Sequence, residues 1–194
     1  MANSYITLAA FKSYARIAST SADTDDDDVI ETLIEGTSRL IDAETGRVWY
    51  PSTDDHLFDL PTRQELILDD DCQSVTAVTN GDGTLISSSD YVVLPANKSP
   101  KFGIVLKAPN IWLPDNNGNG LQCITVSGTW GQAAPTADIV YACKAIAHAA
   151  YKRRFGENVS ATTTITAAGV VVEPQDIPET ARKILLNNRR ITFA

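Results

Sequence analysis

Apolar residues recur at intervals of three and four positions between Val29 and Ile41, a spacing that predicts an amphipathic helix. Aspartates precede this stripe, where the exposed backbone N–H groups of a helix start favour negative charge. Gly46 follows it, where a left-handed cap is favoured. We therefore expect a helix that ends before Gly46 and needs a partner for its apolar face. That face consists of Val29, Ile30, Leu33, Ile34, Leu40 and Ile41.

A second, shorter helix is expected over residues 8–17, with Thr7 as its capping residue. Its buried side consists of Leu8, Phe11 and Ala15, with Tyr14 as a further candidate.

The helical period returns after Pro135 and predicts two more helices. The first has a face of small side chains, which allows close packing, and it runs into the basic cluster 152–154 before Gly156. The second starts at Pro178, because proline is tolerated in a first turn, and extends to residue 191. The small-residue face consists of Ile139, Ala142, Cys143, Ile146, Ala147 and Ala150.

Between residues 55 and 130 the period changes to short β-branched runs, which are typical of antiparallel strands. Asn80–Gly83 is a strong hairpin turn, because Asn and Gly tolerate positive φ. Asp69–Asp71 is expected to be a turn between two strands, and Asp115–Gly120 a long flexible loop. Residues 158–172 are expected to be a mobile loop or a hairpin. The predicted strands are 65–68, 74–78, 91–94, 103–107 and 122–126.

These patterns predict an α+β protein: a small bundle of about four helices interrupted by an antiparallel β module. We place the helical part at residues 1–50 and 131–194 and the β module at 51–130. A chain of 194 residues with 43% apolar content can form one sizeable core or a core with a smaller inserted module.

The net charge of −8 is unevenly distributed. Residues 1–46 carry −6, residues 47–134 carry −5 and residues 135–194 carry +3. This balance disfavours a general nucleic-acid binder, because phosphate affinity needs clustered Lys and Arg. The basic last third is better suited to an acidic protein surface. No apolar run approaches the length of a membrane span, so we expect a protein without a membrane partner.

The residues that could carry chemistry do not form a catalytic or metal-binding pattern. The three cysteines are widely spaced and lack zinc spacing, which predicts no disulfide framework and a reducing compartment. His56 and His148 are the only histidines, and a structural role is favoured for both. A calcium loop at Asp23–Ile34 fails, because Asp28 replaces the required glycine and Ile34 the bidentate glutamate. We expect no cofactor and no metal.

Four segments in this order resemble a known family. They are Tyr5–Lys12, the aspartate-rich approach to Val29–Glu35, Ile41–Arg47, and Gly128–Gly131 with its continuation through Pro135 into the alanine-rich helix. Together they resemble the head-tail connector (head-completion adaptor) proteins of tailed bacteriophages, over a bit more than half of the chain. The β insert is larger here than in the compact helical members.

The resemblance implies a structural subunit that is not an enzyme. Such subunits form a homo-oligomeric ring, usually twelvefold, that docks beneath the portal protein and presents a surface to the next stopper or tail-completion protein. DNA passes through the ring without sequence-specific binding. The implied location is the neck of the virion, at the head-tail interface, and the host cytoplasm during assembly. We expect the free chain to stay monomeric until the portal templates the ring.

Family members contact the portal through the C-terminal segment. By resemblance, the portal-binding candidates are Arg182, Lys183, Ile184, Leu185, Arg189, Arg190, Ile191 and Phe193. The plainer interpretation is that the last helix packs on its own domain. An acidic ring facing the channel is a second candidate site, against the interpretation of a helix start with a solvated face. Its residues are Asp25, Asp26, Asp27 and Asp28.

Two functions from other classes stay open at this level. The first is a module in which the β insert binds a carbohydrate or peptide, with Trp112 and Trp130 as its aromatic surfaces. The second is a hydrolase or nuclease that uses Glu65 with the Asp69–Asp71 run. Consecutive aspartates point in different directions, however, so they do not converge on one ion unaided.

Overall fold

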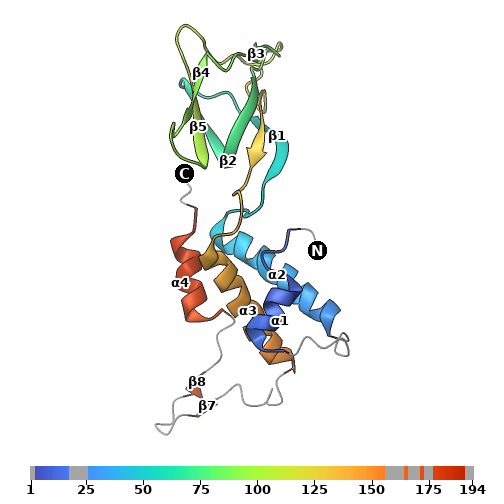
Figure 1. Ribbon diagram of the computed structural model, residues 1–194. Helices are drawn as coiled ribbons and strands as arrows, with labels where there is room; N and C mark the ends of the chain where they lie inside the picture. Colours follow the sequence, from blue (N-terminus) through green and yellow to red (C-terminus); the bar gives the residue numbers. More distant parts are fainter. Residues whose placement is uncertain (1–2, 18–25, 156–163, 166–170, 173–176, 191–194) are drawn as a thin grey trace. The chain divides into compact units, whose positions relative to one another are not determined.

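The computed structural model describes residues 3–17, 26–155, 164–165, 171–172 and 177–190 (Figure 1). The chain divides into two compact units. The helical unit comprises Met1–Gly46 and Pro135–Ala194, and the β unit comprises Arg47–Ala134. The mixture of four α-helices with a six-stranded antiparallel sheet confirms the expected α+β class.

The helical unit contains α1 (Leu8–Ala15), α2 (Asp27–Thr45), α3 (Ala137–Phe155) and α4 (Glu179–Asn187). Figure 1 shows α3 running through the middle of the group, and it packs against each of the other three helices. The two strands β7 (Thr164–Ile165) and β8 (Val171–Val172) pair with each other in antiparallel orientation. This pairing matches the hairpin alternative for residues 158–172, most of which lie outside the described residues.

The predicted helix ends are largely confirmed. The Thr7 hydroxyl accepts the Ala10 N–H at 3.2 Å, as an N-cap should, and Gly46 takes φ +62° and donates its N–H to the Asp42 carbonyl. Two ends differ. α1 stops at Ala15, because Arg16 adopts the left-handed conformation. α4 stops at Asn187, because Asn188 leaves the helical conformation with φ −99° and ψ 3°, and the Asn188 side-chain amide donates to the Ile184 carbonyl.

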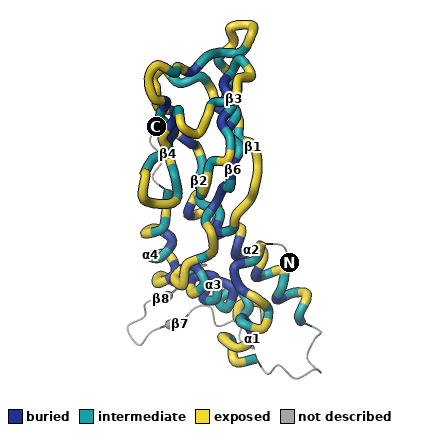
Figure 2. Tube along the Cα trace, turned by 45° about the horizontal axis from the view of Figure 1, so that its top comes forward, coloured by how far each residue is buried: buried dark blue, intermediate teal, exposed yellow. Residues whose placement is uncertain are grey.

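The core of the helical unit forms where small side chains bring α2 and α3 together. Ile30, Ile34 and Ile41 of α2 are fully buried, as are Ile139 and Cys143 of α3. Figure 2 shows buried positions, in dark blue, in this helical group. The expectation for Tyr14 was wrong: it is exposed, and Lys12 is buried instead because its ammonium forms an ion pair with Asp27 at the start of α2. Of the predicted stripe on α2, Leu40 is also exposed.

The β unit is one sheet with strand order β1-β6-β2-β5-β4, and β3 pairs with the end of β2. The bounds are β1 Ser52–Phe58, β2 Glu65–Thr79, β3 Leu85–Ile86, β4 Tyr91–Leu94, β5 Lys101–Leu106 and β6 Ile124–Trp130. The first half of β2 pairs with β5 and the second half with β6, and Cys72 is the residue that faces both neighbours. β1 was not predicted, because its first five residues, Ser52–His56, are polar and show no β-branched apolar run.

One turn prediction was wrong. Asp69–Asp71 lie inside the 15-residue strand β2 rather than between two strands. The strand continues because the Asp71 carboxylate, only 7% exposed, is bonded to Arg47 at 3.0 Å and to Gln132 at 2.8 Å. The Asp71 carbonyl accepts the Gly131 N–H as well. A residue that looks like a turn former is therefore held in the sheet by partners far away in sequence.

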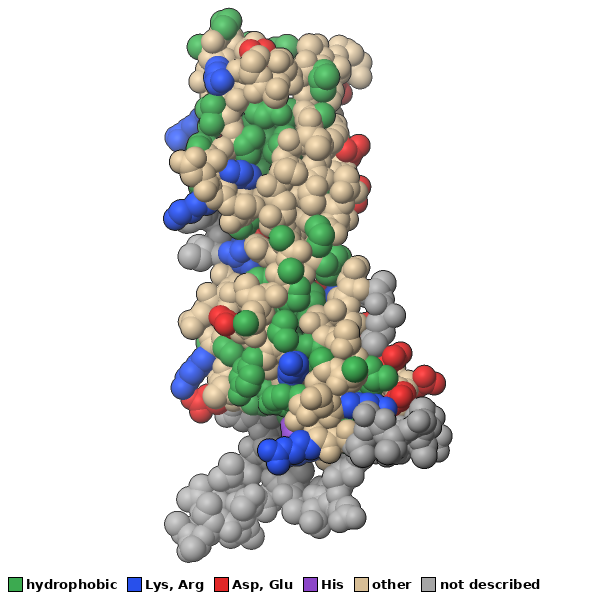
Figure 3. All heavy atoms as spheres, in the orientation of Figure 1, with side chains coloured by type: hydrophobic (Ala, Val, Ile, Leu, Met, Phe, Trp, Pro, Cys, Tyr) green, Lys and Arg blue, Asp and Glu red, His purple; other side chains and the backbone are tan. Residues whose placement is uncertain are grey.

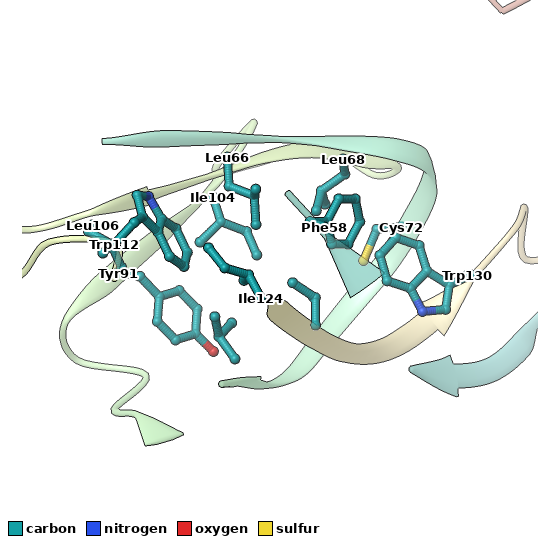
Figure 4. Close-up of a cluster of buried hydrophobic side chains, with 12 residues drawn as sticks. Phe58, Leu66, Leu68, Cys72, Tyr91, Ile104, Leu106, Trp112, Ile124 and Trp130 are labelled. Atoms are coloured by element: carbon teal, nitrogen blue, oxygen red, sulfur yellow. The ribbon is translucent and has the colours of Figure 1, made fainter. Parts of the chain in front are cut away.

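The hydrophobic core of the β unit lies where the two halves of β2 face each other. Figure 4 shows the core side chains pointing toward one another in the space that β2 partly encloses as it bends. The Asn80–Gly83 hairpin turn is confirmed, and Asn80 also accepts the Leu113 N–H at 2.8 Å. The core residues are Phe58, Leu66, Leu68, Cys72, Val78, Tyr91, Ile104, Leu106, Trp112, Ile124, Val126 and Trp130.

Candidate partner-binding surface

The helix α4 has one buried face and one exposed face. Ala181 and Leu185 are buried within the helical unit, and α4 packs on α3 and α2. Arg182, Lys183 and Leu186 are exposed, and Leu186 retains 59% of its surface. The solvent-facing side of α4 therefore combines an apolar side chain with basic ones, which makes it available for contact with another protein.

A shallow cavity of about 200 Å³ lies beside this exposed face. It is lined by Glu44 of α2, Ile177 ahead of α4, and Arg182, Leu185 and Leu186 of α4. Its walls combine apolar side chains with one acidic and one basic group. Such a cavity can accept an apolar side chain of a partner while the two charged groups orient polar atoms around it.

The chain after α4 is held against the end of α2. The Arg190 N–H donates to the Thr45 carbonyl at 2.8 Å. This contact satisfies one of the free carbonyls in the last turn of α2. Residues 179–190 contain one acidic and four basic side chains, so this surface carries a net charge of +3. Lys183 pairs with Glu179 at 2.9 Å, but both are 71% exposed, and such a pair contributes little.

The structure places the eight predicted portal-binding residues in different environments. Arg182, Lys183 and Arg189 are exposed, and Ile184 and Arg190 are half-buried. Leu185 is 3% exposed and packs in its own unit, so for this residue the plainer interpretation holds. Ile191 and Phe193 lie outside the described residues.

Sequence reasoning missed Leu186, Glu44 and Ile177. Leu186 had a signal that could have found it: it lies about 100° around the helix from Leu185, off the stripe formed by Ala181 and Leu185. Glu44 and Ile177 gave no signal, because their role depends on how α2 and α4 pack.

The acidic candidate site is only partly a free surface. Asp27 is engaged by Lys12, and its side chain is 22% exposed. Asp26 precedes the helix as its N-cap residue, without a side-chain cap, and Asp28 is exposed. Asp25 lies outside the described residues. Among the described aspartates of this candidate site, Asp26 and Asp28 are therefore the ones whose carboxylates are open to solvent.

The groups that could carry chemistry are used structurally. Cys72 and Cys143 are buried free thiols, and burial raises the pKa of each to about 11, so neither is a ready nucleophile. His148 packs edge-on to the rings of Tyr14 and Phe11, and burial, followed by the nearby Lys152 charge, lowers its pKa. Within the ranges that the structure describes, no group of three or more His, Cys, Asp or Glu is placed to hold a metal ion.

The aromatic surfaces proposed for ligand binding are not available in the β unit. Trp112 and Trp130 are 8% and 2% exposed and belong to the core. The indole N–H of Trp112 donates to the Gln64 carbonyl at 2.9 Å, and that of Trp130 donates to the Asp54 carbonyl at 3.0 Å. His56 stacks on Trp130 with ring centroids 3.8 Å apart. Trp112 and Trp130 therefore pack inside the core, and His56 covers Trp130 at the border of that core.

The loop Asp115–Gly120 has defined internal hydrogen bonds. The Asp115 carboxylate accepts the N–H groups of Asn117 and Asn119, and the Asp115 N–H donates to the Asn119 carbonyl. One aspartate thus organises this loop.

Among the helices of the described ranges, none is long and apolar enough to cross a membrane.

Comparison with known structures shows the same fold in two particles. The chain is similar to a protein in the neck of an empty gene transfer agent particle computed with C6 symmetry, with TM-score 0.63 and 13% identity. It is similar to a protein in the virion of the native gene transfer agent particle, with TM-score 0.60 and 14% identity. Each match covers 98% of this chain and 92% of the other.

No curated protein sequence matches the chain. A family model does: the head completion protein family matches residues 4–191. This match includes all four helices and the whole sheet. The chain therefore belongs to the head completion protein family.

Proposed function

We propose that this chain is a head-tail connector subunit that forms a ring against the portal and carries the next component of the tail. Family membership supports the role in head completion, and the two similar structures, taken from the neck and the virion of gene transfer agent particles, support the location. The observation that carries the proposal is the basic, partly apolar outer face of α4 with its adjoining cavity.

The same observations support a role through assembly alone, in which the protein makes and breaks no covalent bond. Subunits that meet their neighbours through two different surfaces form a closed ring when the rotation between them closes, and such a ring needs no catalytic group. The similar neck was computed with C6 symmetry, which supports a copy number that is a multiple of six, such as twelve. The net charge of −8 suits a conduit from which DNA is repelled rather than bound.

On the portal side, we propose that Arg182, Lys183 and Arg189 meet an acidic surface and that Leu186 enters an apolar site. Charges around such a contact direct the approach, and the buried apolar side chain supplies most of the affinity. Leu185 is left out of this contact surface, because its side chain belongs to the core of the helical unit.

The test is co-purification with the portal protein of the same particle, with ring formation measured by mass photometry. Removal of residues 178–194 would be ambiguous, because it also takes Ala181 and Leu185 out of the core. The sharper variant is Leu186→Asp, which should abolish portal-bound rings and leave the thermal unfolding midpoint within a few degrees. The matched control is Leu40→Asp on α2, also an exposed leucine of the helical unit.

Portal-bound rings for wild type and Leu40→Asp, with loss for Leu186→Asp, support both the connector role and the contact. Equal binding by the two variants contradicts the assignment of the α4 face. A folded wild-type chain that never associates with the portal contradicts the connector role itself.

A further inference from the structure

The sheet of the β unit ends in two strands with an open side. In the strand order, β1 and β4 each have a neighbour on one side only. The Asp90 carbonyl accepts the Lys107 N–H at 2.8 Å, next to the pair Tyr91 and Leu106. Because hydrogen-bonded pairs alternate in an antiparallel ladder, Tyr91 and Val93 direct their own N–H and C=O groups away from β5. Those groups are free to pair with an added strand.

The β4 margin, meaning the edge strand β4 and the residues that flank it, is mainly basic, with Asp90 as the acidic residue directly ahead of the strand. The three lysines of the β unit all follow β4 within a short stretch of chain, at Lys98, Lys101 and Lys107. The Lys101 ammonium donates to the Pro95 carbonyl at 2.6 Å, and the Lys107 ammonium donates to the Ser89 carbonyl at 2.7 Å. These two ammonium groups are therefore fixed beside the two ends of β4, and neither forms an ion pair with a residue that the structure describes.

The margin at β1 is acidic. Asp54 and Asp55 lie in the middle of this strand, and both are exposed. Neither carboxylate is paired with a basic group within the described ranges, and the Asp54 carboxylate accepts the Asp55 N–H at 3.0 Å. Figure 3 shows the result for the β unit: Lys and Arg side chains lie along the margin on the β4 side, and Asp and Glu side chains lie along the other.

We propose that the β4 margin of one copy of this chain pairs with the β1 margin of the next copy, so that the sheet continues from subunit to subunit. The inference rests on the proposed ring, which requires two different, complementary surfaces on each subunit. Pairing of two β4 margins would oppose lysines to lysines, and pairing of two β1 margins would oppose aspartates to aspartates. Only the mixed pair brings opposite charges together, and it is the pair that can close a ring.

The first test measures portal-templated rings by mass photometry across a range of chain concentrations. The variant pairs are Lys98→Glu with Lys107→Glu, and Asp54→Lys with Asp55→Lys. Each pair should raise the concentration needed for half-maximal ring formation by about tenfold, because like charges then face each other. A chain with all four changes should form rings near the wild-type concentration, because its margins are complementary again. Arg63→Glu, an exposed change in the loop between β1 and β2, is the control for lost charge.

The outcomes separate this contact from the ring itself. If wild type and both charge variants form rings equally well, the margin contact is wrong and the connector role stands. If the charge variants fail and the fourfold variant fails as well, charge complementarity between the margins is wrong. If folded wild type forms no ring on the portal, the connector role and the margin contact fall together.

A second measurement uses wild-type protein and hydrogen exchange of single amides. The Tyr91 and Val93 amides, which face the open side of β4, should exchange at least about tenfold more slowly in portal-bound rings than in the free chain. The Val92 amide, which faces β5, serves as the internal control and should change little. Unchanged exchange at Tyr91 and Val93 in assembled rings overturns the proposal.

Discussion

At the scale of single residues, Asp71 shows how a distant partner overrides a local preference. Aspartate favours turns because its side chain competes for nearby backbone groups. Here the carboxylate is taken by Arg47 and Gln132, which lie 24 and 61 positions away in sequence. The residue is then free to keep an extended backbone inside β2. No pattern around positions 69–71 contains this information.

Gly131 is a residue whose identity is required by a close approach of the backbone. It has φ +82°, and a Cβ atom added there would lie 2.3 Å from the Tyr50 carbonyl oxygen. We expect Gly131→Ala to lower the free energy of unfolding by about 3 kcal/mol, because strain at positive φ adds to a collision with backbone. The measurement is urea unfolding followed by tryptophan fluorescence, since Trp130 lies in the core beside this position.

Gly83 provides the matched control for this substitution. Its φ is +83°, but no atom lies within 4 Å of an added Cβ. Gly83→Ala should therefore cost only the conformational part, about 1 kcal/mol. Equal losses for the two variants would mean that the approach of the Tyr50 carbonyl carries no energy.

At the scale of secondary structure elements, helices were easier to predict than strands. Caps such as Thr7 and Gly46 act within four residues of the helix end, so the information is local. The strand β1 had no such signal. It is an edge strand whose first five residues are polar, and it exists because β6 provides a partner along its whole length, from Ser52 with Trp130 to Phe58 with Ile124.

The packing of α3 on α1 makes the helical unit sensitive to pH through His148. Burial against Phe11 and Tyr14, with the Lys152 charge as a smaller cause, lowers the pKa of His148 below 6.5. As pH falls, the unfolded chain therefore binds this proton before the folded chain does, and stability is lost. The loss begins near the unfolded pKa and continues down to the lowered folded pKa.

We expect the helical signal in circular dichroism to melt at lower urea at about pH 5.5 than at about pH 7.5. In His148→Gln this difference between the two pH values should shrink, since the variant has no imidazole to protonate. His56→Gln, a change in the β unit, should leave the difference as it is in wild type. A pH difference that His148→Gln leaves intact would assign the effect to other groups.

At the scale of the whole molecule, the two chain ends of the β unit are held together within the unit itself. The chain enters at Arg47 and leaves at Ala134, and the two ends are bonded to each other: the Gln132 N–H donates to the Val48 carbonyl at 2.7 Å. The hydrophobic cluster also belongs entirely to residues 47–134. A segment with paired ends and its own core has what it needs to fold alone.

We therefore expect residues 47–134, expressed alone, to unfold cooperatively in urea. The control segment 55–130 lacks Arg47, Gln132 and the first half of β1, so Asp71 is left buried without its partners. That segment should be less stable by about 3 kcal/mol or should not fold. Non-cooperative unfolding of 47–134 would mean that the helical unit is needed for the sheet.

The sequence alone determined the four helices and the hairpin at Asn80–Gly83, because helix periods, caps and tight turns depend on residues within a few positions of each other. The family was indicated by the resemblance of four segments, and the family model over residues 4–191 shows it. Tertiary structure decided that Asp69–Asp71 lie in a strand and that Leu185 is buried while Leu186 is exposed. It also decided which strands form the edges of the sheet. These features depend on which distant segments meet, and that information resides in the packing of the whole chain rather than in any single stretch of it.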